Sequence, residues 1–259
     1  MNKAYSKPTL VICLSIIASV GLACNSFNKN ETVSPAQSND TRSTDNPSAP
    51  TSTASTTSTG SREIAGDYTI TGTNEGGGGS YGGELKVTKR DEVYQFSWSS
   101  GGRTYDGVGV RSDDNVAVAF TEGSDGKGCG VVLYNIASDG SLEGKAGYWG
   151  VNKSELEKAT RKSGTELEGT YDVVGSAPSG SEYKGKLSVN KAGVGYSFTW
   201  DTGTTTKGFG VRTGTKVAAG LGGKQCGFVI YEIRPDGTLD GKWGGQSSTS
   251  IGTEIAKMK

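Results

Sequence analysis

The chain contains no histidine, which removes the commonest general base and the commonest nitrogen ligand of metal ions. Catalytic arrangements of the Ser-His-Asp or Cys-His kind are therefore excluded, as are zinc sites that combine cysteine with histidine. Cysteine is scarce as well, with 4 residues among 259. These absences predict a protein that is not an enzyme and needs neither a metal ion nor a cofactor.

Net charge is absent too, and proline is rare. Lys and Arg together number 27, and so do Asp and Glu, so nothing in the charge balance favours a nucleic-acid partner. There are only 6 prolines but 42 glycines, and the glycines show no collagen-like period. We interpret these glycines as turns and tight corners between short strands.

Residues 1–23 have the features of a signal peptide. Lys3 and Lys7 precede an apolar run, Leu10–Val20, that is short for a membrane span. The run ends at Gly-Leu-Ala-Cys24, which resembles the lipobox of bacterial lipoproteins, except that a glycine replaces the usual aliphatic residue. The resemblance implies that Cys24 carries fatty acids such as palmitate and anchors the mature protein in a membrane. The alternative is an ordinary secretory signal cut near Ala23.

Residues 24–62 consist almost entirely of Ser, Thr, Asn, Pro and Ala, with no apolar period. Such a composition buries too little apolar surface to offset the entropy of ordering the chain. We therefore expect a disordered linker that holds the folded part away from the membrane. With the lipid anchor, this predicts a protein of the bacterial cell envelope, at the outer membrane or the cell surface.

One stretch of the remaining sequence occurs twice. Cys129–Lys145 and Cys226–Lys242 align without a gap, and ten of the 17 positions are identical. Each stretch has an arm rich in β-branched and aromatic residues, an Asp-Gly turn and a second, alternating arm, which is the pattern of a β-hairpin. The repeated stretch therefore predicts that one small β-domain has been duplicated.

The duplication extends over about eight short strands in each copy. Tyr94, Phe96 and Trp98 alternate with polar residues in the first copy, and the same types recur at Tyr196, Phe198 and Trp200. Sequential short strands favour a meander, and closure of a meander removes its exposed edges. We expect an all-β protein with two tandem, antiparallel eight-stranded barrels, at residues 63–163 and 164–259. Two β-sandwiches, or one larger sheet, are the alternatives.

The first arm of the hairpin is apolar on both faces. We assign the face with Val132 and Tyr134 to the domain core; the face with Val131 and Leu133 is covered by the other domain or exposed as a binding patch. Cys129 and Cys226 hold equivalent positions in the two copies. They are candidates for an interdomain disulfide, which requires Cα atoms within about 7 Å. Two half-buried free thiols are the alternative.

The candidate binding residues are side chains at matching positions of the two copies: Trp98, Trp200, Tyr134, Tyr231, Arg111 and Arg212. The tryptophans would line the interiors if the barrels are hollow. The arginines either seat an anionic group or, as we prefer, cover a barrel mouth. Glu155 and Glu254 are acids at positions that we match in the closing strands, and we expect both to face solvent.

Both repeats contain Gly-x-Tyr, Tyr-x-Phe-x-Trp, Gly-x-Gly-Val, Cys-Gly-x-Val-x-Tyr and Asp-Gly-x-Leu-x-Gly in this order. This pattern resembles that of a group of small exported bacterial proteins, some of them labelled fibronectin-binding. In outline, the meander is also similar to avidin-like and lipocalin-like barrels. Our leading hypothesis is a non-enzymatic binding or adhesion module for a host-matrix or envelope protein. The alternatives are a carrier of a small apolar ligand and an envelope enzyme that uses carboxylates; the oligomeric state stays open.

Overall fold

A computed structural model of the chain describes residues 62–246 and 248–259, and its regular elements are all strands apart from one short 3-10 turn. The predicted signal peptide, Cys24 and the linker up to residue 61 lie outside the described residues. The elements are β1 (Gly66–Thr73), η1 (Glu75–Gly77), β2 (Ser80–Arg90), β3 (Val93–Ser100), β4 (Arg103–Ser112), β5 (Asn115–Glu122), β6 (Gly130–Ile136), β7 (Leu142–Tyr148), β8 (Glu155–Ser163), β9 (Gly169–Ser176), β10 (Glu182–Ala192), β11 (Gly195–Asp201), β12 (Thr205–Thr213), β13 (Lys216–Leu221), β14 (Gly227–Ile233), β15 (Leu239–Gly244) and β16 (Gly252–Met258).

The strands form where the sequence alternates. In β3, Tyr94, Phe96 and Trp98 point into a core, whereas Ser97 and Ser99 on the other face are less buried. The duplicated hairpin turns as expected: Gly237 has φ 88°, and the Asp236 carboxylate accepts a hydrogen bond from the Thr238 amide at 2.9 Å. Local turn chemistry and a period of two therefore account for the strands.

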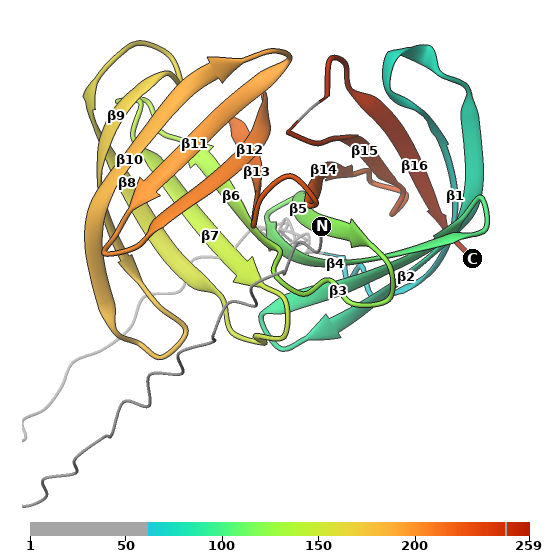
Figure 1. Cartoon of the computed structure of the whole chain (residues 1–259). Coiled ribbons are helices and arrows are strands. Elements are labelled where there is room, and N and C mark those ends of the chain that lie inside the picture. The colour runs from blue at the N-terminus through green and yellow to red at the C-terminus, as the bar shows by residue number, and fades with distance from the viewer. Residues whose placement is uncertain (1–61, 247) are drawn as a thin grey trace, which may run out of the picture. The chain divides into compact units, whose positions relative to one another are not determined.

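The sheets close into two eight-stranded antiparallel barrels, as predicted (Figure 1). The strands are not divided between them as predicted. One barrel contains β1–β5 together with β14–β16, and we call it the split barrel; the other contains β6–β13 and is the continuous barrel. The predicted boundaries of the two barrels, at residues 63–163 and 164–259, are therefore wrong. The two repeats have exchanged parts, so the continuous barrel is inserted between β5 and β14 of the split barrel.

The exchange is possible because both connectivities make the same kinds of strand pair. β5 pairs with β14, so that Val118 lies opposite Val229. An unexchanged first repeat would pair β5 with β6 and place Val118 opposite Val132, the counterpart of Val229. β13 pairs with β6 in the same manner. The strand interfaces alone therefore do not select one arrangement over the other.

The outward faces of the exchanged strands share one apolar cluster. Val131 and Leu133 of β6 and Phe228 and Ile230 of β14 are buried in it, together with residues of β3, β4, β5, β12 and β13. The second apolar face of the hairpin arm is thus covered by the neighbouring barrel and is not an exposed patch. Val132 and Tyr134 lie in the core of the continuous barrel, as expected.

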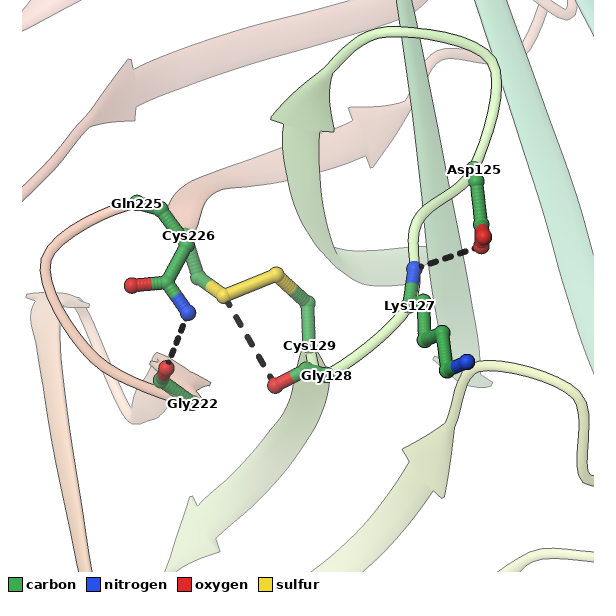
Figure 2. The surroundings of a disulfide bond; sticks show 7 residues. All are labelled: Asp125, Lys127, Gly128, Cys129, Gly222, Gln225 and Cys226. Carbon is green, nitrogen blue, oxygen red and sulfur yellow. Dashed lines mark hydrogen bonds between the residues drawn. A yellow bond between two sulfur atoms is a disulfide. The ribbon is translucent and has the colours of Figure 1, made fainter. Parts of the chain in front are cut away.

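Cys129 and Cys226 form a disulfide, with their Cα atoms 5.8 Å apart. Cys129 ends the crossover from β5 to β6, and Cys226 ends the crossover from β13 to β14. Figure 2 shows the bond joining these two loops, where the Gln225 side-chain amide also donates to the Gly222 carbonyl at 2.7 Å. The bond therefore links the two points at which the chain passes between the barrels. Within the described residues, no helix has the length and hydropathy that a membrane span requires.

Candidate functional site

One end of each barrel is closed by a segment that precedes a strand. Ile64 lies before β1 and Leu167 before β9, and both side chains are buried. The Tyr68 hydroxyl donates to the Ile64 carbonyl at 2.7 Å, and the Tyr171 hydroxyl donates to the Leu167 carbonyl at 2.8 Å. Among the described residues, these buried side chains therefore close one end of each barrel, and the cavities lie toward the other end.

Arg111 and Arg212 lie at the closed ends. The Arg111 Nε atom donates to the Asp113 carbonyl at 2.8 Å, and the same guanidinium also donates to the Arg62 carbonyl. The Arg212 Nε atom donates to the Gly214 carbonyl at 2.8 Å. Neither arginine lines an interior cavity. Their contacts with turn carbonyls agree with the covering role that we preferred, and they are not brought together with the aromatic candidates.

The split barrel contains a cavity of about 290 Å³ at its other end. Six aromatic rings line it, each from a different strand: Tyr81, Trp98, Tyr105, Phe120, Tyr231 and Trp243. Exposed residues of the β1–β2 and β3–β4 connections, among them Asn74 and Gly101, also line the cavity. It therefore extends from the aromatic core to the surface.

The carboxylate of Glu254, on β16, lies in this aromatic cavity and is only 5% exposed. One oxygen accepts hydrogen bonds from the Trp98 indole at 3.0 Å and from the Tyr231 hydroxyl. The other accepts from the Tyr81 hydroxyl at 3.0 Å. Three neutral donors therefore hold one carboxylate in a fixed position.

The continuous barrel repeats this arrangement around Glu157, which is 8% exposed. The carboxylate accepts from the Trp200 indole at 3.1 Å, the Tyr183 hydroxyl at 3.0 Å and the Tyr134 hydroxyl. A cavity of about 290 Å³ lies beside it. The four aromatic candidates from the sequence are thus brought together in two pairs, Trp98 with Tyr231 and Trp200 with Tyr134.

Glu254 was misjudged from the sequence, and Glu157 was not singled out at all. We expected Glu254 and Glu155 to face solvent and to match each other. Both expectations are wrong, because Glu254 is buried and Glu155 is half-buried and lines the cavity of the continuous barrel. The counterpart of Glu254 is Glu157, which stands 97 positions earlier, the same separation as that between the two cysteines. Keeping this offset through the variable loop before the closing strand would have aligned the two buried acids.

Burial changes the ionisation of these acids. Loss of hydration raises the pKa of Glu254, although its three hydrogen bonds oppose the change. Burial also raises the pKa of Glu155, which lies in the cavity of the continuous barrel, and the nearby charge of Glu157 acts in the same direction. Among the described residues, no Lys or Arg forms an ion pair with Glu155, Glu157 or Glu254. Each cavity therefore contains at least one glutamate side chain that no Lys or Arg of the described residues pairs with.

Comparisons of the chain with family models, with curated proteins and with solved structures give no match. The described part of the chain also contains no group of three or more side chains suited to hold a metal ion. A cavity with aromatic walls and one fixed carboxylate can accommodate a small organic molecule.

Replacing Glu254 by glutamine is expected to raise the free energy of unfolding at neutral pH by about 1 kcal/mol, the usual size of a stabilising substitution. The amide oxygen can accept from Trp98 and Tyr231. The amide nitrogen can donate to Tyr81, whose hydroxyl then donates to the Thr253 carbonyl, 3.3 Å away. Denaturant unfolding of wild type and Glu254→Gln measures the difference.

The gain should depend on pH in a defined direction. Because the folded state raises the pKa of Glu254, this group favours folding while protonated, and that contribution is lost as pH rises through the raised value. The advantage of Glu254→Gln should therefore shrink as pH falls below that value. A difference in unfolding free energy between variant and wild type that stays constant from about pH 4, near the ordinary pKa of a carboxyl group, to about pH 8 would contradict this account.

Proposed function

We propose that the protein binds small molecules in the interiors of its two barrels, one in each. The observation that carries this proposal is the repeated site: a cavity of about 290 Å³ that contains a tryptophan, tyrosines and a fixed carboxylate in both barrels. This volume is near the lower end of small-molecule sites, about 300–1,000 Å³, so the ligand is small. An eight-stranded barrel has room for one such ligand.

The carboxylates support binding over a purely structural role. A buried charge without a cationic partner opposes folding, and an apolar residue of similar size would be less costly. Each glutamate nevertheless occurs with the same tryptophan and two tyrosines in both barrels, although seven of the 17 positions in the repeated hairpin differ. Groups that oppose folding and persist in this way are typical of binding sites.

The predicted adhesion to a host-matrix or envelope protein stays a prediction, as does the absence of enzymatic activity. Neither has a specific structural observation in its favour. The cavities favour the carrier among our sequence hypotheses, but their carboxylates do not suit the apolar ligand that we expected. We retain the predicted lipid at Cys24 in the proposal. It would keep the two binding barrels at the cell envelope, on a linker long enough to give them free access to solutes.

A ligand that accompanies the purified chain is the expected result. Native mass spectrometry should give one or two added masses on the folded chain, and solvent extraction should release the same species. Protein unfolded in denaturant, dialysed and refolded serves as the matched control and should lack these masses. A folded chain that carries no added mass, and whose thermal midpoint no cationic, neutral or anionic small molecule raises, would contradict small-molecule binding.

A further inference from the structure

The two cavities have an excess of negative charge. The basic residue that lines the cavity of the split barrel, Arg103, is exposed and already bridges Glu122 at 3.2 Å. The cavity of the continuous barrel is lined by Glu155 and Glu157 and by no basic residue. Buried carboxylates are most stable beside a cation, and the protein supplies none from its described residues. The complementary charge must come from a ligand.

The walls indicate what kind of cation fits. Hard metal ions require several oxygen ligands, usually with more than one carboxylate. The cavity of the split barrel offers one carboxylate among aromatic rings, and that of the continuous barrel offers two beside four rings and three threonines. The described residues contain no group of three or more acidic, His or Cys side chains suited to a metal ion. Faces of tryptophan and tyrosine rings attract ammonium groups, and this attraction is strongest where water is excluded. In the split barrel, Trp98, Tyr81 and Tyr231 all contact the carboxylate directly. The aromatic rings and the negative charge of Glu254 therefore lie at the same place in the cavity.

We propose that both cavities bind organic ammonium ions, with the cationic nitrogen beside Glu254 in the split barrel and beside Glu157 in the continuous barrel. This inference rests on the proposed small-molecule function and assigns the chemical class of the ligand. The Trp98 and Trp200 rings contact the alkyl groups on the nitrogen, and the carboxylate balances its charge.

One cross-strand pair distinguishes the two cavities. Trp243 lies opposite Gly252 in the split barrel, and a Cβ atom at Gly252 would be 2.3 Å from the indole. The equivalent pair in the continuous barrel is Ala146 opposite Glu155. A large ring over a glycine is thus replaced by a small residue and a second carboxylate. The split barrel is suited to a monocation with aromatic or alkyl groups, and the continuous barrel to a dication.

Calorimetric titration of the full chain with matched probes tests this assignment. Benzyltrimethylammonium should bind the split barrel at least about tenfold more tightly than neopentylbenzene, in which carbon replaces nitrogen, because a desolvated cation–aromatic contact has an energy of that order. Phenylacetate should not bind. Similarly, 1,4-diaminobutane should bind the continuous barrel, and butane-1,4-diol should not.

Four variants assign the sites. Glu254→Gln should abolish the preference for benzyltrimethylammonium, and Glu157→Gln should abolish binding of the diamine. The double change Ala146→Trp with Glu155→Gly introduces into the continuous barrel the Trp–Gly pair that Trp243 and Gly252 form in the split barrel. This variant should make the continuous barrel prefer benzyltrimethylammonium over the diamine. Glu143→Gln, at an exposed ion pair with Lys158 on the outside of the same barrel, is the control and should bind as wild type.

Each outcome decides between the two proposals. Equal binding of the charged probe and its carbon isostere would overturn the ammonium assignment and leave small-molecule binding intact. Cation binding that survives Glu254→Gln and Glu157→Gln together, in a chain that still unfolds cooperatively, would also overturn it. If no probe binds and the purified chain carries an extractable neutral or anionic ligand, only the assignment fails; if it carries no ligand at all, both proposals fail.

Discussion

Truncating Trp98 to alanine is expected to destabilise the split barrel by about 3–5 kcal/mol. The side chain is 7% exposed and stacks on Phe96, with the ring centroids 5.6 Å apart. Its indole also donates to Glu254. The truncation removes packing and a donor to a buried carboxylate at once. Because small domains are stable by only about 5–15 kcal/mol, the loss is large enough to open this barrel in mild denaturant.

Trp98→Phe separates the two contributions. Phenylalanine retains most of the apolar contact with Phe96 and Phe120 but cannot donate to Glu254. We expect it to cost about 1–3 kcal/mol, the range for leaving a buried polar group without a partner. Equilibrium unfolding in urea, followed separately for each variant, measures both values. Equal costs for the alanine and phenylalanine variants would show that the hydrogen bond, and not the packing, is the main contribution of the side chain.

The exchange of strands determines where the damage from Trp98→Ala appears. In urea that opens only the weaker barrel, amide protection should be lost in residues 66–122 and 227–258 and kept in residues 130–221. If each repeat formed its own barrel, protection would instead be lost from residues 66–163 and kept from residue 169 onward. Hydrogen exchange read by mass spectrometry distinguishes these patterns, and the second one would contradict the exchange.

The strands could be predicted because their causes are local. Alternation in segments such as Tyr94–Trp98, and turn residues such as Asp236-Gly237, depend on neighbours a few positions away. The closure into barrels followed from the need to remove sheet edges. The inward positions of Trp98, Trp200, Tyr134 and Tyr231 followed from the same period of two, and all four lie at the buried carboxylates.

The partners of the exchanged strands could not be predicted in this way. β5 offers the same residues to β6 as to β14, since Val132 and Val229 are equivalent positions of the repeat. What distinguishes the two arrangements lies in the crossovers and in the packing between barrels, both of which are non-local. The buried glutamates were missed for a different reason. An acid in a strand usually faces solvent, and only the three donors around Glu254, from separate strands, overcome that tendency.

Removing the disulfide is expected to lower the free energy of unfolding of the continuous barrel by about 4 kcal/mol. Cys129 and Cys226 are 97 residues apart, and the loop that their bond closes contains all strands of this barrel. Closing a loop of that length restricts the unfolded chain by about 4–5 kcal/mol in the chain-entropy account. Urea unfolding of wild type with and without reductant measures the effect. The Cys129→Ser, Cys226→Ser double variant should not respond to reductant.

The split barrel should hardly respond to the same reduction. When it opens while the continuous barrel stays folded, Leu221 of β13 remains paired with Gly130 of β6. Cys129 lies directly before Gly130, and Cys226 lies a few positions after Leu221. The two cysteines therefore stay close together whether or not the bond exists. The bond then closes a short loop and restricts little. We therefore expect a change below about 1 kcal/mol for the opening of the split barrel.

This asymmetry follows only from the exchanged arrangement. If the repeats folded separately, each barrel would contain one of the two cysteines. Opening either barrel alone would then free one end of the disulfide-closed loop. Reduction would then not destabilise residues 130–221 more than the rest of the described chain. Trp98→Ala combined with reduction makes the comparison direct, because the truncation opens the split barrel first and leaves the continuous barrel to unfold in a separate transition. A loss of about 4 kcal/mol in that second transition, with the first unchanged, is the expected result; equal shifts in both would show that the disulfide does not enclose a complete barrel.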